Sequence, residues 1–420
     1  MKYLKQMLCV GICGVMLAAA TGCSGSLTGG KRIIRISHAQ SETHPEHLGL
    51  LKFKEYVEAN LGDKYEVQIF PNELLGSAQK AIELTQTGAI DFVVAGTANL
   101  ETFADVYEIF SMPYLFTSEE AYHAVMNDTD YMENVYDSTD EAGFRVMTWY
   151  NAGTRNFYAT TPIYTPDDLK GLKIRVQQSP ASVKMVQAFG AAATPLSFGD
   201  VYTAIQQHVI DGAENNELAL TNNKHGEVAK YFSYTKHQMV PDMLVGNLKF
   251  LNSLSDEELA IFKEAARLST EEELSCWDDQ VEEAKQIAEN DMGVTFIDVD
   301  ISEFSNKVSN VQQEMLDANP DIHLVCIDTL SKIKPKAKPF ENAYDADYDY
   351  MGRLKAFADS RGICVLLVHH TRKSKNPEDS FDNINGSTGI LGAADFTIVL
   401  DKQSRMDDEA GFLLTGRDIE

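Results

Sequence analysis

Short apolar segments alternate with amphipathic ones along the first part of this chain, and this alternation limits the fold more than any other feature of the sequence. Residues 33–36, 65–70 and 91–95 are short and rich in β-branched or aromatic residues, as strands are. Residues 46–60 and 78–87 separate them and have helical periodicity. Regular alternation of strands and helices predicts an α/β fold, in which helices pack on a sheet.

The middle of the chain continues in the same style. Residues 144–149 and 173–176 are predicted strands, and residues 180–189 and 199–207 are predicted helices. The α/β pattern therefore extends well beyond the first sheet.

One long charged helix is predicted over residues 255–292. Ser255 and Glu258 have the spacing of a capping box, which satisfies backbone donors at a helix start. Thr270 and Glu273 repeat that spacing, so the helix can be continuous or kinked in its middle. Its many carboxylates are expected to form a solvated face.

The charge of the chain excludes one broad class of function. The 420 residues have a formal net charge of −27, whereas a nucleic-acid-binding protein needs a basic face for phosphates. An anionic ligand would therefore have to be held by local cations against an unfavourable overall field.

The N-terminus has the pattern of an export signal. A short lysine-containing start precedes the apolar residues 7–20, which are too few to span a bilayer comfortably. The small residues that follow lead into Cys23 and resemble a bacterial lipobox, in which the cysteine thiol is diacylated. Residues 1–23 are therefore predicted to be a lipoprotein signal peptide, and residues 24–31 a flexible tether.

Two arginines are candidates for holding an anion. Arg155 follows the segment 151–154, and Arg175 lies on the predicted strand 173–176. A guanidinium offers a planar set of donors that matches a carboxylate in bidentate fashion. Two or three charge-assisted bonds of roughly 1.5–3 kcal/mol each supply most of the roughly 8 kcal/mol needed for micromolar affinity.

Several motifs around these arginines resemble one known family. They are residues 72–76 (NELLG), 171–175 (GLKIR), 190–202 (GAAATPLSFGDVY) and 210–215 (IDGAEN). Together they resemble the DctP-type solute-binding proteins of tripartite ATP-independent periplasmic (TRAP) transporters, and the resemblance covers about residues 32–321.

The resemblance implies a two-lobed periplasmic binding protein fold, with a long helix that crosses both lobes. The first lobe is expected to contain about residues 32–150 and 240–300, and the second about residues 151–239. The two lobes would close over a ligand by a hinge motion.

The resemblance also implies roles for individual residues. Arg175 would clamp the ligand carboxylate, and Arg155 would assist it. Asn215 would hydrogen-bond the ligand, and Phe198 would pack against it.

The ligand is expected to be a sugar acid. His44 and Glu42 are predicted to lie at the cleft edge and to contact ligand hydroxyls, and Trp149 is a further candidate contact. A hexuronate is favoured and a C4-dicarboxylate is the next choice. His38, His44 and His47 are close in sequence, but no carboxylate or cysteine completes the spacing of a metal site, so neither a metal nor a cofactor is predicted.

The last part of the chain, residues 323–420, resembles the later half of a RecA-like ATPase of the RepA type. That resemblance implies that Asp328 is the Walker B acid and that His369 or His370 is a nucleotide sensor. The segment lacks a phosphate-binding loop and the strand and helix that carry one, so it is interpreted as a truncated, non-functional ATPase fragment.

The predicted function is that of an extracytoplasmic receptor for a small carboxylate, which it passes to the membrane subunits of a TRAP transporter. The protein is expected to attach to the cell membrane by its lipid, to bind no nucleic acid and to have no catalytic residue. Two alternatives remain open: a ligand sensor for a signalling partner, and an ATPase or replication function of the tail.

Overall fold

The computed structural model describes residues 30–116, 118–318, 324–328 and 342–369, together with residues 381, 384, 390, 392, 394–401 and 411–416. The chain divides into two compact units, Met1–Gln312 and Gln313–Glu420. No helix in the described parts of the chain is long and apolar enough to cross a bilayer.

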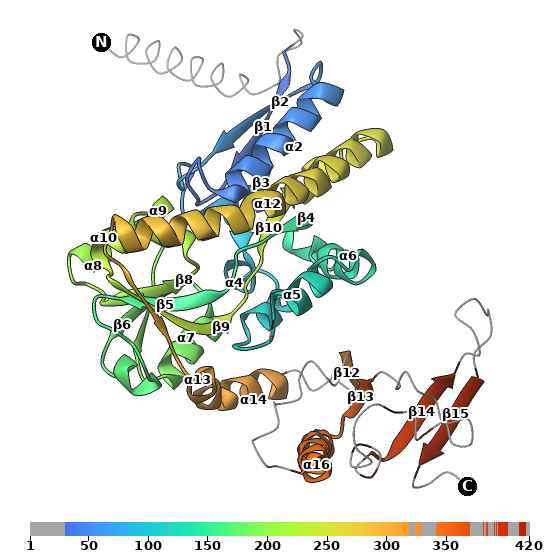
Figure 1. The fold of residues 1–420 in the computed structure, drawn as a ribbon. Helices are drawn as coiled ribbons and strands as arrows, with labels where there is room; N and C mark the ends of the chain where they lie inside the picture. The colour runs from blue at the N-terminus through green and yellow to red at the C-terminus, as the bar shows by residue number, and fades with distance from the viewer. Residues whose placement is uncertain are drawn as a thin grey trace, which may run out of the picture. The chain divides into compact units, whose positions relative to one another are not determined.

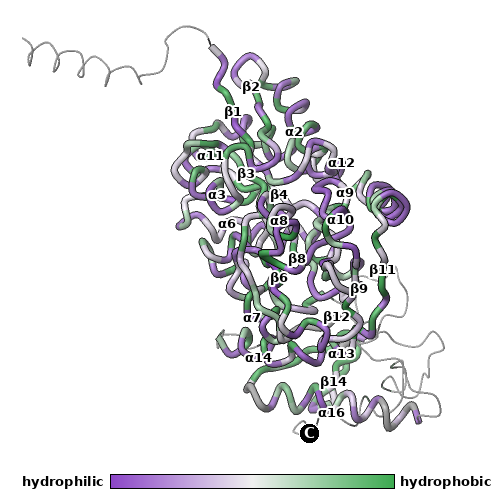
Figure 2. Tube along the Cα trace, turned by 90° about the vertical axis from the view of Figure 1, so that its left-hand side faces the viewer, coloured by the Kyte–Doolittle hydropathy of each residue, from purple (hydrophilic) through white to green (hydrophobic). Residues whose placement is uncertain are grey.

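The first lobe of the larger unit is built on a five-stranded mixed sheet (Figure 1). Strand β1 pairs in parallel with β2 and β3, whereas β10 is antiparallel to both of its neighbours. The sheet order is β2 (Tyr65–Phe70), β1 (Arg32–Ser37), β3 (Phe92–Gly96), β10 (Asp242–Asn247) and β4 (Phe144–Tyr150). Strand β3 is buried along its whole length. Figure 2 colours the chain by hydropathy and shows the hydrophobic stretch at β3.

The second lobe contains a six-stranded sheet. Its order is β11 (Thr295–Asp298), β9 (Tyr231–Gln238), β5 (Arg155–Ala159), β8 (Gly212–Asn215), β6 (Lys173–Val176) and β7 (Ala192–Pro195). The lobe boundary expected near residue 300 is therefore wrong, because β11 pairs in parallel with β9 of this second sheet. The long helix that crosses both lobes ends in the second lobe. The strand that follows it, β11, therefore pairs with an edge strand of the second sheet.

Helices cover the sheets of the larger unit. Those associated mainly with the first sheet are α2 (Pro45–Leu61), α3 (Ala78–Thr87), α4 (Thr97–Leu100), α5 (Glu119–Met126), α6 (Thr129–Asp137) and α11 (Leu248–Leu251). Those that follow strands of the second sheet are α7 (Pro180–Ala188), α8 (Val201–Gln206), α9 (Leu218–Asn222), α10 (His225–Val228), α13 (Ile301–Lys307) and α14 (Ser309–Asp317). The α/β fold class is confirmed.

The long helix α12 (Asp256–Asn290) runs across both lobes without a break (Figure 1). Ser255 and Glu258 form the predicted capping box at its start. The alternative of a kinked helix is wrong, because Thr270 does not cap a second helix. Its hydroxyl donates instead to the carbonyl of Trp149 at 2.7 Å, which ties the helix to strand β4.

Close packing fixes α12 against α2. A Cβ added at Gly49 would lie 2.5 Å from the carbonyl oxygen of Ser269, so only glycine permits this approach of the two helices. Further along α12, Trp277 and Ala284 pack with Leu218 of α9 in the second lobe. The helix therefore connects the two cores.

The chain also crosses between the sheets in two short segments. Residues 151–154 connect β4 to β5, and residues 239–241 connect β9 to β10. Both crossings bring residues of the two lobes to the same place, which is where the cavity described below lies.

In its described residues, the smaller unit contains two separate pairs of strands. Strand β12 (Leu324–Asp328) is parallel to β13 (Cys364–Val368), with helix α16 (Ala343–Arg361) between them in sequence. Strand β14 (Phe396–Asp401) is antiparallel to β15 (Gly411–Gly416). Large apolar side chains are exposed on these strands, including Leu366, Phe396 and Leu400.

Candidate functional site

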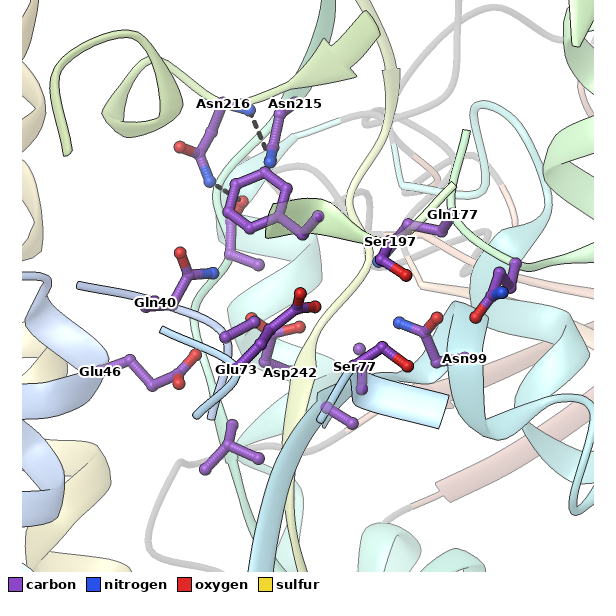
Figure 3. Close-up of a pocket in the computed structure, with 18 of the residues that line it drawn as sticks. Gln40, Glu46, Glu73, Ser77, Asn99, Gln177, Ser197, Asn215, Asn216 and Asp242 are labelled. Atoms are coloured by element: carbon purple, nitrogen blue, oxygen red, sulfur yellow. Dashed lines mark hydrogen bonds between the residues drawn. The ribbon is translucent and has the colours of Figure 1, made fainter. Parts of the chain in front are cut away.

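A cavity lies between the two lobes of the larger unit and encloses about 680 Å³ of space free of protein atoms, part of it open to solvent. Its lining is strongly polar (Figure 3). The polar lining residues of the first lobe are Gln40, His44, Glu46, Glu73, Ser77, Asn99 and Asp242. Those that follow the crossing to the second sheet are Arg155, Arg175, Gln177, Gln178, Ser197, Asn215 and Asn216.

Arg175 is a buried cation at this cavity. It lies on β6 and is 4% exposed, and its Nε donates to the carbonyl of Leu196 at 2.9 Å. Its guanidinium carbon lies 5.6 Å from the ring centre of Phe198. No carboxylate of the described residues forms an ion pair with it, and burial lowers its pKa from the ordinary value. A buried charge without a counter-ion is costly, so this site favours an anionic guest.

Arg155 lines the same cavity but already has a counter-ion. Its Nε and Nη2 donate to the two carboxylate oxygens of Glu214, the latter at 2.9 Å, and its Nη2 also donates to the Glu214 carbonyl at 2.8 Å. Burial disfavours both charges, yet Arg155 and His237 hold the pKa of Glu214 at about 2. Arg155 therefore contributes oriented donors rather than a free positive charge.

Asn215 and Phe198 complete this side of the cavity. The Asn215 Oδ1 accepts from Arg155 Nη1 at 3.2 Å and from the Asn216 backbone N–H at 2.9 Å. These bonds fix the orientation of the Asn215 side-chain amide, and neither of them uses its NH₂ group. Phe198, in the short helix η4 (Phe198–Asp200), packs edge-on against His225 and presents an apolar wall.

The first lobe brings carboxyl groups to the cavity. Glu46 lies in the first turn of α2 and Asp242 begins β10, and both residues line the cavity. Burial raises the pKa of Glu46 to about 8. Burial and the charge of Glu46 raise the pKa of Asp242 well above its ordinary value. Because burial raises the pKa values of both carboxyl groups and two negative charges close together are unfavourable, the pair holds at least one proton near neutral pH.

Glu73 is the third carboxyl group of the lining. It accepts a hydrogen bond from the Gly199 backbone N–H at 3.1 Å, which connects the two lobes. Asn72 and Glu73 both have positive φ, of 54° and 55°, a conformation that non-glycine residues rarely adopt. This unusual turn directs Glu73 towards the cavity.

The histidine cluster lies partly behind the lining. His44 lines the cavity, where its Nδ1 accepts from the Glu46 backbone N–H at 3.2 Å. His38 Nε2 lies 2.9 Å from His47 Nδ1, and His38 Nδ1 lies 3.3 Å from Glu46 Oε1. Burial lowers the pKa of His44 to about 3 and that of His38 to about 4, so both rings are neutral near pH 7.

Two predicted contacts lie elsewhere. Glu42 is exposed on the loop before α2 and does not line the cavity. Trp149 packs in the core of the first lobe, with ring centres 5.6 Å from both Tyr122 and His123. Thr148 and Tyr150 point to α12, and side chains alternate along a strand, so Trp149 must face the opposite side of β4.

Sequence reasoning missed the acidic half of the site. Glu73 lies inside the NELLG motif and Asp242 begins a segment of the family pattern, but neither pattern indicates a role for its carboxyl group. Glu46 lies in the first turn of a helix, where acidic residues are common because their charge interacts favourably with the helix dipole. Its position in the sequence therefore does not indicate a ligand contact.

Several other expectations fall outside this cavity. Cys23 and His370 lie outside the described residues, as does the side chain of Asp328. The backbone of Asp328 ends β12, and His369 follows β13, so the ends of these paired strands are adjacent. Their predicted role as a remnant ATPase site stays a prediction.

Comparison with known proteins identifies the family to which the larger unit is similar. The sequence profile of the bacterial extracellular solute-binding proteins, family 7, matches residues 36–319, and a profile of an AAA domain matches residues 264–376. The protein YiiZ of Salmonella typhimurium, whose function is uncharacterised, is 38% identical over 283 residues, which are 67% of this chain and 86% of YiiZ.

Two solved structures of TRAP periplasmic solute-binding proteins are also similar. The one from Anaerococcus prevotii, with bound α/β-D-glucuronate, is 51% identical with a TM-score of 0.68, over 69% of this chain and 94% of that one. The one from Sulfitobacter, with bound β-D-galacturonate, is 31% identical with a TM-score of 0.67, over 69% and 96%. The chain belongs to the family 7 bacterial extracellular solute-binding proteins, the receptors of TRAP transporters.

Proposed function

We propose that the solute bound by this receptor is a hexuronate, such as D-glucuronate or D-galacturonate. The protein is an extracytoplasmic solute receptor and not an enzyme, and its family binds small carboxylates for uptake through TRAP membrane subunits. The finer assignment to a hexuronate rests on the chemistry of the cavity and on the sugar acids bound by the two similar structures.

The single observation that carries the proposal is Arg175, a buried cation that forms no ion pair with a carboxylate of the described residues, at a cavity otherwise lined by hydrogen-bonding groups. A ligand carboxylate would take the two terminal nitrogens of its guanidinium. The amides and carboxyl groups around the rest of the cavity suit several hydroxyls, which both donate and accept.

Binding between two lobes also explains how capture becomes closure. The ligand carboxylate would contact the second lobe and the ligand hydroxyls would contact the first. The ligand would thus join two surfaces that are exposed to water in the open form. Contacts made only in the closed state shift the population towards it.

Isothermal titration calorimetry tests the assignment directly. We expect D-glucuronate or D-galacturonate to bind with a Kd in the micromolar range or below, and succinate to bind at least about 100-fold more weakly, which corresponds to about 2.7 kcal/mol. Absence of binding by both uronates at millimolar concentration, or tighter binding of succinate, would refute the hexuronate assignment.

We propose in addition that Cys23 carries a lipid that holds the receptor at the cell membrane. The apolar run before Cys23 and the small residues next to it support this proposal. Expression with a radiolabelled fatty acid should label the wild type and leave Cys23→Ser unlabelled, and the variant should leave the membrane fraction. Equal labelling of the two proteins would contradict lipidation at Cys23.

A further inference from the structure

The two lobes contribute opposite chemistry to the cavity. The second sheet supplies the cations Arg155 and Arg175, whereas the first lobe supplies Glu46, Glu73 and Asp242. Figure 3 shows these three carboxyl groups gathered on the side of the cavity away from Asn215 and Asn216. A ligand held by its carboxylate at Arg175 therefore presents its other end to acids.

Glu46 and Asp242 form the centre of this acidic end. Glu46 is 2% exposed, and it lines the same cavity as Asp242. A Cβ at Gly96 would lie 2.9 Å from Asp242 Oδ1 and 2.9 Å from Gln177 Nε2. Only glycine leaves room there, so Asp242 is held close to the cavity beside an amide.

Among the residues that the structure describes, none beside the pair is free to neutralise an additional negative charge. The groups that face it from neighbouring elements are His38, His44, His47, Tyr122, Tyr150, Arg155 and Glu273. Among them Arg155 is the cation, and Glu214 already neutralises it. Glu273 adds a further buried acid, whose pKa burial raises well above its ordinary value.

We propose that Glu46 and Asp242 determine specificity by accepting ligand hydroxyls and excluding a second carboxylate. The receptor then takes sugar acids with one carboxylate and rejects those with a carboxylate at both ends. This inference rests on the proposed function, since it assumes that a hexuronate carboxylate occupies Arg175.

The physical reason is an asymmetry between hydroxyls and carboxylates. A protonated carboxyl group donates a hydrogen bond and an ionised one accepts, so the pair satisfies a hydroxyl in either form. A carboxylate beside the pair either meets a like charge or forces the uptake of another proton. Exclusion is therefore strongest at high pH, where protons are scarce.

D-Glucuronate and D-glucarate are the first pair of probes, because glucarate carries a second carboxylate at C1, where glucuronate has the hemiacetal carbon that closes its ring. L-Gulonate, an open-chain monocarboxylate with a CH₂OH group at that carbon, separates the effect of the second charge from that of the lost ring. At pH 8.5 we expect glucarate to bind the full chain at least about 100-fold more weakly, the effect of a unit charge at about 5 Å with an effective dielectric of about 20. At pH 5.5 the ratio of the glucarate Kd to the glucuronate Kd should fall, because Glu46 and Asp242 can then take up the proton that glucarate binding requires.

Asp242→Asn and Glu46→Gln test the pair itself. Each removes an ionisable group while keeping the size and a hydrogen-bonding amide. Both variants should reduce the ratio of the glucarate Kd to the glucuronate Kd at pH 8.5 to about 10 or less. They should also make this ratio depend less on pH. Glu289→Gln removes an exposed carboxylate of α12 and should leave the ratio at its wild-type value.

The outcomes separate this inference from the proposed function. If the wild type binds neither uronate, the hexuronate assignment fails. If it binds glucuronate and also binds glucarate within about 3-fold, the assignment stands and the exclusion of a second carboxylate is wrong. A wild-type ratio that both variants retain would likewise overturn the role of Glu46 and Asp242. If one variant loses all binding, the other variant and the wild-type pH series decide.

Discussion

Replacement of Arg175 by methionine should abolish tight binding without weakening the fold. Methionine keeps the length and most of the volume of the side-chain stem and removes the charge. In the protein, the guanidinium uses its Nε for the carbonyl of Leu196, so the N–H groups of its two terminal nitrogens remain for a ligand. Two charge-assisted bonds of about 1.5–3 kcal/mol each give a loss of about 3–6 kcal/mol, or about 10²–10⁴ in Kd.

The unliganded protein should respond differently from the complex. Arg175 is buried and forms no ion pair with a carboxylate of the described residues, so its charge opposes folding. Because the cavity admits water, this penalty is smaller than in a dry core. We expect the Tm of the unliganded Arg175→Met variant to stay within about 3 °C of wild type or to rise.

Calorimetry and thermal unfolding with and without D-glucuronate measure both effects. Saturating ligand should raise the Tm of the wild type and leave that of the variant unchanged. Arg267→Met is a matched control, because Arg267 is an exposed arginine of α12 paired with Glu264 and Glu271. An Arg175→Met variant with a Kd within about 3-fold of wild type, or with a Tm lowered by more than about 5 °C, would refute the reasoning.

Three further predictions concern the fold and its ionisable groups. Arg155→Ala removes the arginine partner of the buried Glu214 and leaves only His237 beside it, so it should cost about 3–5 kcal/mol in denaturant unfolding, whereas Arg155→Met with Glu214→Gln should recover most of the loss; a stable single variant would contradict the ion pair's role. Burial raises the pKa of Glu46 from its ordinary value of 4.5 to about 8 in the folded protein, so its stabilising contribution is complete below about pH 4.5 and is lost as pH rises towards 8; the decline in Tm over that range should be shallower in Glu46→Gln, and an equal slope would argue against this assignment. A chain that ends at Ala318 should bind glucuronate with the Kd of the full chain, and calorimetry showing more than about 5-fold weaker binding would mean that the tail contributes.

Local signals in the sequence were sufficient for much of the fold. Strand and helix periodicities identify five of the eleven strands described in the two lobes, β1 to β4 and β6, and the helices α2, α3, α7, α8 and α12. The Ser255–Glu258 box marks the start of α12 correctly. These features depend on residues a few positions apart, which is the range over which a sequence pattern acts. The position of Arg175 within its motif likewise indicated a buried arginine at the cavity.

Only the tertiary structure decided which partners meet across long separations. Glu214 reaches Arg155 from 59 positions away, and that pairing turns one of two similar arginines into a neutralised group. Glu46 of α2 and Asp242 of β10 meet at one cavity although they are far apart in the sequence, and strand β11 belongs to the second sheet because of its parallel pairing with β9. The sequence determined which chemical groups this protein carries and which local elements hold them. Folding determined which charges lie together, because Coulomb and hydrogen-bond energies depend on distances in space rather than along the chain.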